Sequence, residues 1–84
     1  MSVDENDIKA AVRRYIVEEL RPGARIGDDE SMLEAGLIDS MAITKLLEFI
    51  EDRFGVEIPD EEFEPENFET LNAIATLVHK KQRA

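Results

Sequence analysis

Apolar residues near the amino terminus recur every three or four positions, which is the spacing of one face of an α-helix. These apolar positions are Ile8, Ala11, Val12, Tyr15, Ile16 and Leu20. Asp4 is a suitable N-cap, because a carboxylate there can accept a hydrogen bond from a backbone N–H of the first turn. The sequence Arg21-Pro22-Gly23 is expected to end this helix.

A second helix is predicted from about Ser40 to Phe54, with Gly55 at a left-handed C-terminal position. At about 100° per residue its apolar positions form one continuous face. That face contains Ile43, Leu46, Leu47, Ile50 and Phe54, and the opposite, polar face contains Thr44, Lys45, Glu48, Glu51 and Asp52. Met41 falls within the polar face, so an exposed apolar side chain is expected there.

Thr70 is expected to cap a third helix whose core-facing residues are Leu71, Ile74, Ala75, Leu77 and Val78. Residues 22–39 lack a sustained period and predict a long loop with a short turn around residues 31–34. Pro59 is suited to the first position of a short helix over residues 60–63. The pattern predicts an all-α, four-helix bundle with three main helices, one short helix and a long first loop.

With 84 residues, the chain has room for one domain, residues 1–84. It has no cysteine and only His79 as a histidine, which argues against disulfides, thiolate chemistry and a metal site. The polar amino terminus and the absence of a long apolar run predict no signal peptide and no membrane span. The core is expected to be aliphatic, since the chain holds only four Phe, one Tyr and no Trp. The protein is expected to be a cytoplasmic monomer.

Charge adds a constraint on partners. The formal net charge is -10, and residues 28–69 hold fifteen acidic residues against only Lys45 and Arg53. Such a surface disfavours binding to nucleic acid and favours protein partners with basic surfaces.

The segment Gly36-Leu37-Ile38-Asp39-Ser40-Met41 enters the second predicted helix. It resembles the attachment motif of acyl and peptidyl carrier proteins, in which an Asp-Ser pair followed by Leu or Met opens this helix. The resemblance extends over roughly residues 5–80, and includes Phe54-Gly55-Val56-Glu57-Ile58-Pro59 and the helix after Thr70. It implies the four-helix fold of the acyl carrier family.

The resemblance also implies a prosthetic group and a role for two residues. A phosphopantetheinyl transferase would transfer 4'-phosphopantetheine from coenzyme A to the hydroxyl of Ser40, and Asp39 would help that enzyme bind metal and recognise the site. Physics is consistent with this position, because a phosphodiester at the start of a helix lies near free amide groups and the positive end of the helix dipole. Two alternatives stay open: Ser40 as an ordinary N-cap, and Asp39 as a helix cap.

As a carrier, the protein would hold acyl or aminoacyl groups as thioesters and pass them between enzymes of fatty-acid, lipid or specialised-metabolite biosynthesis, with no catalytic residue of its own. The exposed Met41 would enter a partner's apolar pocket. The acidic residues Glu48, Glu51 and Asp52 would face basic surfaces on the partner enzymes. These partners would be the transferase, an acyl- or aminoacyl-adenylating ligase, and synthases or acyltransferases.

Several residues favour a specialised carrier over the general fatty-acid carrier. Lys45 and Phe49 depart from the residues common in that carrier. Residues 62–71 resemble those of freestanding carriers, including carriers that receive D-alanine from an adenylating ligase.

The sequence disfavours two rival functions and leaves a third open. A calcium loop starting at Asp28 is disfavoured, because Leu33 stands where the turn glycine of an EF-hand belongs. A hydrolase is disfavoured, because Ser40 lacks the glycine-flanked elbow of such enzymes. An unmodified acidic adaptor that docks on a basic protein partner stays open as the alternative.

Overall fold

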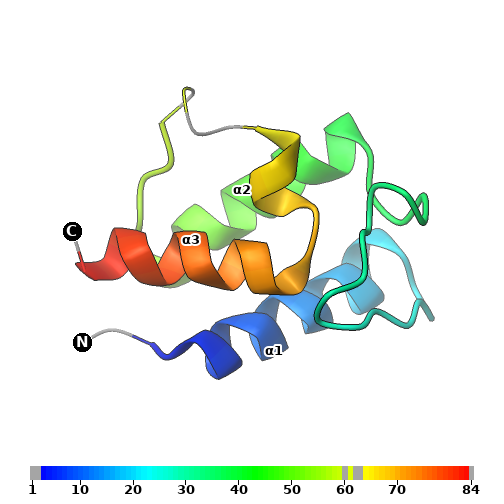
Figure 1. Ribbon diagram of the computed structural model, residues 1–84, viewed down its shortest axis with the longest axis horizontal. Coiled ribbons are helices and arrows are strands. Elements are labelled where there is room, and N and C mark those ends of the chain that lie inside the picture. Colours follow the sequence, from blue (N-terminus) through cyan, green and yellow to red (C-terminus); the bar gives the residue numbers. More distant parts are fainter. Residues whose placement is uncertain (1–2, 60, 62–63, 84) are drawn as a thin grey trace.

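The computed structural model describes residues 3–59, 61 and 64–83, and within them every regular element is helical. The elements are α1 (Glu5–Tyr15), the π-helical turn η1 (Ile16–Leu20), α2 (Ser40–Phe54), the 3-10 turn η3 (Pro65–Phe68) and α3 (Leu71–Arg83). Helices α1 and α3 lie side by side in opposite directions, and α2 packs against both (Figure 1). The prediction of an all-α fold with three main helices and a long first loop is confirmed.

Helix α1 begins directly after Asp4, the predicted N-cap. Asp4 lies outside the helix and its Oδ1 accepts a hydrogen bond from the amide of Asp7 at 3.0 Å. Ile8, Val12 and Ile16 are fully buried. The helix ends before Arg21, as expected, but its last turn is wider than an α-helix, because the amide of Arg21 bonds the carbonyl of Ile16. This π turn was not predicted.

Helix α2 has the predicted bounds, and Gly55 ends it with φ +66°. Ile43, Leu46 and Ile50 are buried. Leu47 and Phe54 are only half-buried, so the predicted apolar face is wider than the part that reaches the core.

Helix α3 is capped by Thr70, whose Oγ1 accepts a hydrogen bond from the amide of Ala73 at 3.0 Å. All five residues predicted to face the core are buried: Leu71, Ile74, Ala75, Leu77 and Val78. The turn η3 before this helix was not predicted, but it places Phe68 in the core, with none of its surface exposed. The short helix expected over residues 60–63 lies outside the described residues, apart from Glu61.

The long loop, residues 22–39, is anchored to the core by Ile26, Met32 and Ile38. It also bonds the segment before α3: the amide of Met32 donates to the carbonyl of Glu69 at 2.8 Å, and Ser31 Oγ donates to the Glu69 carboxylate at 2.6 Å. The predicted short turn is present, since the amide of Ala35 bonds the carbonyl of Ser31 at 3.0 Å. The buried side chains and these hydrogen bonds therefore hold the loop in place as far as Ile38.

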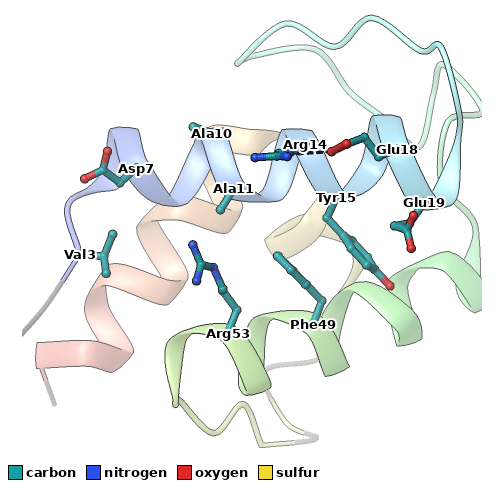
Figure 2. Close-up of a pocket in the computed structure, with 10 residues that line it drawn as sticks. All are labelled: Val3, Asp7, Ala10, Ala11, Arg14, Tyr15, Glu18, Glu19, Phe49 and Arg53. Carbon is teal, nitrogen blue, oxygen red and sulfur yellow. Dashed lines mark hydrogen bonds and ion pairs between the residues drawn. The ribbon is translucent and has the colours of Figure 1, made fainter.

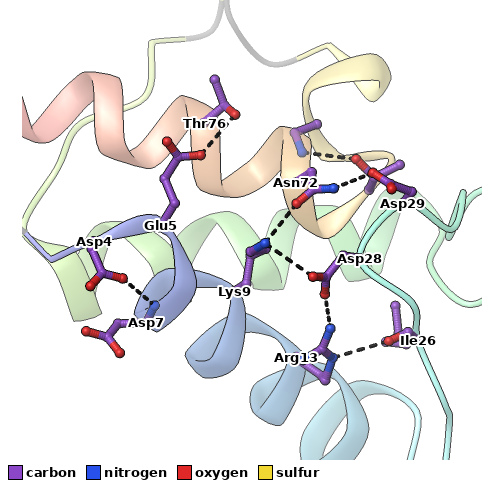
Figure 3. A network of polar contacts seen from close by, with 12 residues as sticks. Asp4, Glu5, Asp7, Lys9, Arg13, Ile26, Asp28, Asp29, Asn72 and Thr76 are labelled. Atoms are coloured by element: carbon purple, nitrogen blue, oxygen red, sulfur yellow. Dashed lines mark hydrogen bonds and ion pairs between the residues drawn. The ribbon is translucent and has the colours of Figure 1, made fainter.

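A polar network fixes the first half of the same loop (Figure 3). The Asp28 carboxylate accepts hydrogen bonds from Lys9 Nζ, at 3.2 Å, and from Arg13 of α1. Lys9 also donates to Asn72 Oδ1 of α3 at 3.0 Å. The hydrogen bond from Lys9, helped by the charges of Lys9 and Arg13, holds the pKa of Asp28 below its ordinary value. The network thus ties the loop to α1 and α3 together.

No helix in the described part of the chain is both long enough and apolar enough to cross a membrane.

Candidate functional site

The candidate site lies where the long loop enters α2. Ile38 is 3% exposed and holds the end of the loop against the core, and the next residue, Asp39, has an extended backbone with φ -130° and ψ -172°. Asp39 and Ser40 are both exposed. The buried Ile38 therefore fixes the position at which the Asp-Ser pair meets solvent.

Asp39 is the N-cap of α2. Its Oδ1 accepts a hydrogen bond from the amide of Ala42 at 2.9 Å, and its carbonyl accepts one from the amide of Ile43 at 2.8 Å. Ser40 is the first residue inside the helix, so the alternative that Ser40 is the N-cap is wrong. The capping role considered for Asp39 is confirmed.

Because Asp39 supplies the cap, the capping role does not fall to the hydroxyl of Ser40. Its Oγ makes no hydrogen bond to any residue that the structure describes, and its carbonyl accepts one from Thr44 Oγ1 at 3.0 Å. Among those same residues, the amides of Ser40 and Met41 also have no backbone partner. A phosphodiester on Ser40 Oγ would lie beside these amides and the positive end of the helix dipole. The residues present fit a phosphate-linked group.

The predicted docking residues divide into two groups. Met41 is 72% exposed, and Glu48 and Asp52 are exposed about two and about three turns further along the same face of α2. Glu51 is half-buried, and its carboxylate accepts a hydrogen bond from the amide of Ile58 at 3.0 Å. Glu51 thus holds the segment after α2, a task that the sequence did not indicate.

A hollow of about 660 Å³ between α1 and α2 was also not predicted (Figure 2). On one side of it the ring of Phe49 stacks on that of Tyr15, with centroids 4.2 Å apart and planes within 8°. Burial, followed by the charges of Glu19 and Glu48, raises the pKa of the Tyr15 hydroxyl. The stack accounts for the bulky residue at position 49, since Phe49 joins the two helices.

Candidate metal ligands do not gather within the described residues, where no three acidic or histidine side chains come together.

Comparisons with known proteins agree with this geometry. The model of the family described as "Phosphopantetheine attachment site" matches residues 10–78. The D-alanyl carrier protein of Streptococcus sanguinis (strain SK36) is 33% identical over 78 residues, which cover 93% of this chain and 99% of that protein. The D-alanyl carrier protein of Streptococcus suis (strain 98HAH33) is 34% identical over 72 residues, which cover 86% of this chain and 91% of that protein.

A solved structure is similar as well. It is described as "Crystal structure of FAD-dependent dehydrogenase", and one of its chains matches with a TM-score of 0.71 and 33% identity, over 80% of this chain and 97% of that chain. The sequence match over most of the chain, the helical fold and the exposed serine agree. This chain belongs to the phosphopantetheine-attachment family, as a carrier protein with covalently attached 4'-phosphopantetheine.

Proposed function

We propose that Ser40 is the attachment residue and that the protein carries thioester-bound groups between enzymes without catalysing a reaction itself. The observation that supports this most is the exposed hydroxyl of Ser40 at the first position of α2, which makes no hydrogen bond to any described residue. When bound, the prosthetic group supplies the thiol that this cysteine-free chain lacks. The chain presents the group on a fixed helix start and stabilises its phosphate with the free amides of the first turn.

Among cargoes, we propose an amino acid, D-alanine, loaded by an ATP-dependent adenylating ligase. The support is the likeness to D-alanyl carrier proteins, three of which are 32 to 34% identical over most of their length. A second candidate follows from the solved structure, whose description names an FAD-dependent dehydrogenase. In that case an acyl or aminoacyl group would be oxidised while it is held on the arm. The sequence identity to the D-alanyl carrier proteins is similar to the identity to the chain of the solved structure. A loading experiment must therefore decide between the two candidate functions.

Partner docking is assigned to the exposed face of α2 around the attachment residue. Met41 would enter an apolar pocket of the partner, while Glu48 and Asp52 would face basic side chains. Charged contacts at the edge of an interface mainly raise the rate of encounter. Rapid, reversible contact suits a carrier that visits several enzymes.

The test is a two-step loading experiment followed by intact-mass measurement. The apo protein, treated with a broad-specificity transferase and coenzyme A, should gain one phosphopantetheinyl group. With D-alanine, ATP and a D-alanine-adenylating ligase, the holo protein should then gain one D-alanyl group that hydroxylamine removes. Unchanged mass in the first step would contradict the carrier role and favour the unmodified adaptor. A normal first step with no D-alanyl gain would reject this cargo alone.

Replacing Asp39 with asparagine separates its two proposed roles. Asparagine caps helices about as well as aspartate, so the free energy of unfolding should change by less than about 1 kcal/mol. The loading rate should fall about tenfold, because the carboxylate charge that the transferase and its metal would recognise is gone. Stopped time courses of mass gain, with thermal unfolding in parallel, measure both. If Asp39→Asn loads at the wild-type rate, the role of Asp39 is limited to capping.

A further inference from the structure

Arg21, the residue that follows η1, contacts the long loop just before the candidate attachment residue. Arg21 is exposed, and one edge of its guanidinium group bonds two successive carbonyls. Its Nε donates to the carbonyl of Leu37 at 3.1 Å, and its Nη2 donates to the carbonyl of Gly36 at 3.1 Å. Leu37 lies only three residues before Ser40 in the chain. Arg21 therefore holds the loop from outside, close to the point at which the Asp-Ser pair meets solvent.

The π turn of η1 fixes the backbone from which the Arg21 side chain starts. The amide of Arg21 donates to the carbonyl of Ile16 at 2.7 Å, and the carbonyl of Arg21 accepts from the amide of Ala24 at 3.0 Å. A regular α-helix joins residues four apart, so this wider turn sends the side chain out in a different direction. The end of η1, the loop and the start of α2 lie at the same end of the molecule (Figure 1). The π turn thus gives Arg21 a fixed origin beside the loop.

The end of the loop, residues 31–38, is a compact turn that is held at both ends. Backbone hydrogen bonds between its own residues close it, and Gly36 takes a left-handed conformation, with φ +72°, that favours glycine. Glu69 bonds the start of this turn, and Arg21 bonds its end. Two contacts from distant parts of the chain therefore fix the segment that leads into α2.

The two hydrogen bonds of Arg21 affect the local order of the loop more than the stability of the fold. Both lie at the surface, where water competes for the same groups and the net gain in stability is small. A loop segment with few buried contacts can open without unfolding of the whole domain. Loss of the Arg21 guanidinium group should therefore loosen the end of the loop while the helices stay folded.

We propose that Arg21 is a positioning residue for the modification of Ser40, because it holds the end of the loop and so presents the hydroxyl to the transferase in a reactive position. The inference rests on the proposed attachment at Ser40. Asp39 follows the held segment and caps α2, so a loose loop end also loosens the cap and the first turn that carries the hydroxyl. A misplacement of about 1 Å can slow a reaction about a hundredfold. Arg21 acts through the loop and not on the reacting hydroxyl itself.

The experiment measures the kinetics of a broad-specificity transferase with the apo carrier as its substrate, for the wild type, Arg21→Lys and Arg21→Gln. In both variants kcat should be about tenfold lower, with no rise in KM. Partial unfolding would have a different effect, because a smaller folded fraction of the substrate raises the apparent KM and leaves kcat unchanged. Lysine keeps the charge but lacks the planar pair of donors, so Arg21→Lys should not restore kcat.

Amide hydrogen exchange of the apo protein gives a second readout that does not depend on loading. The amides of Leu37 and Ile38 both bond the carbonyl of Met32, at 2.8 and 3.4 Å. They should exchange at least about fivefold faster in both Arg21 variants, because the turn opens more often. The amide of the buried Ile50 in α2 should keep its wild-type rate.

Arg14→Lys is the matched control, since it makes the same substitution at another exposed arginine. The Arg14 guanidinium group bonds the Glu18 carboxylate at 2.7 Å, within one face of the first helical segment and not on the loop. This variant should keep the wild-type kcat, KM and exchange rates. An equal fall in kcat for Arg14→Lys and Arg21→Lys would reject a specific role of Arg21.

The outcomes separate this inference from the proposed function. A wild type that gains no mass contradicts attachment at Ser40, and the positioning role with it. Normal loading of the wild type, with an unchanged kcat in both Arg21 variants, keeps the carrier role and overturns the positioning role, whatever the exchange rates. A wild-type kcat in Arg21→Lys alone would mean that the charge suffices, which overturns the role of the two hydrogen bonds.

Discussion

Replacing Ser40 with alanine should abolish loading completely: after treatment with transferase and coenzyme A the variant keeps its apo mass, while the wild type gains one phosphopantetheinyl group. The fold should not suffer, because the Ser40 hydroxyl is exposed and Asp39 provides the cap. Exposed positions of this kind usually change the free energy of unfolding by less than about 0.5 kcal/mol. Intact mass and thermal unfolding of the same sample measure both effects.

Ser31→Ala is the matched control, since it removes a hydroxyl from the same loop region. Ser31 Oγ donates to the Glu69 carboxylate at 2.6 Å and accepts from the amide of Glu34 at 3.2 Å. Losing it should lower stability by about 1 kcal/mol and leave loading complete. Mass gain by Ser40→Ala would refute attachment at this residue, and loss of loading in both variants would point to an effect of loop structure.

The second large effect is expected from Phe68→Ala. Phe68 is fully buried at the end of η3, and truncation of a buried phenylalanine costs about 3–5 kcal/mol. In a domain of this size each kcal/mol lowers the melting temperature by about 4–8 °C, so a fall of at least about 12 °C is expected. Thermal unfolding followed by circular dichroism measures it.

Phe54→Ala is the control for this experiment, because it deletes the same side chain from a half-buried position. Phe54 meets Phe49 edge to face, with centroids 6.5 Å apart, and its loss should cost clearly less than that of Phe68. Equal melting temperatures for the two variants would mean that Phe68 is not a central core residue.

Phe68 is also relevant to function, because its chain neighbour Glu69 binds the long loop. Glu69 accepts the amide of Met32 and the hydroxyl of Ser31, and so holds the loop that ends at Ser40. The segment before α3, far away in the chain, therefore helps to place the loop that leads to the proposed attachment residue. Loss of Phe68 should loosen this link, whereas Ser40→Ala removes the reacting group and leaves the link intact.

Local signals in the sequence determined the main helices. The three-to-four spacing of apolar residues located α1, α2 and α3, and the caps Asp4 and Thr70 and the terminating Gly55 were found because each acts on backbone groups within a few residues. The Asp-Ser pair at a helix start, in its wider context, indicated the carrier family that the comparisons confirm.

Only the tertiary structure decided the features that depend on segments distant in the chain. The π turn of η1, the 3-10 turn η3 and the half-burial of Leu47 had no local signal in the sequence. The hollow between α1 and α2, beside the stacked rings of Tyr15 and Phe49, joins two helices that are distant in the chain, and no local pattern brings them together. Periodicity and caps report interactions along one helix, whereas hollows and loop anchors depend on contacts between elements.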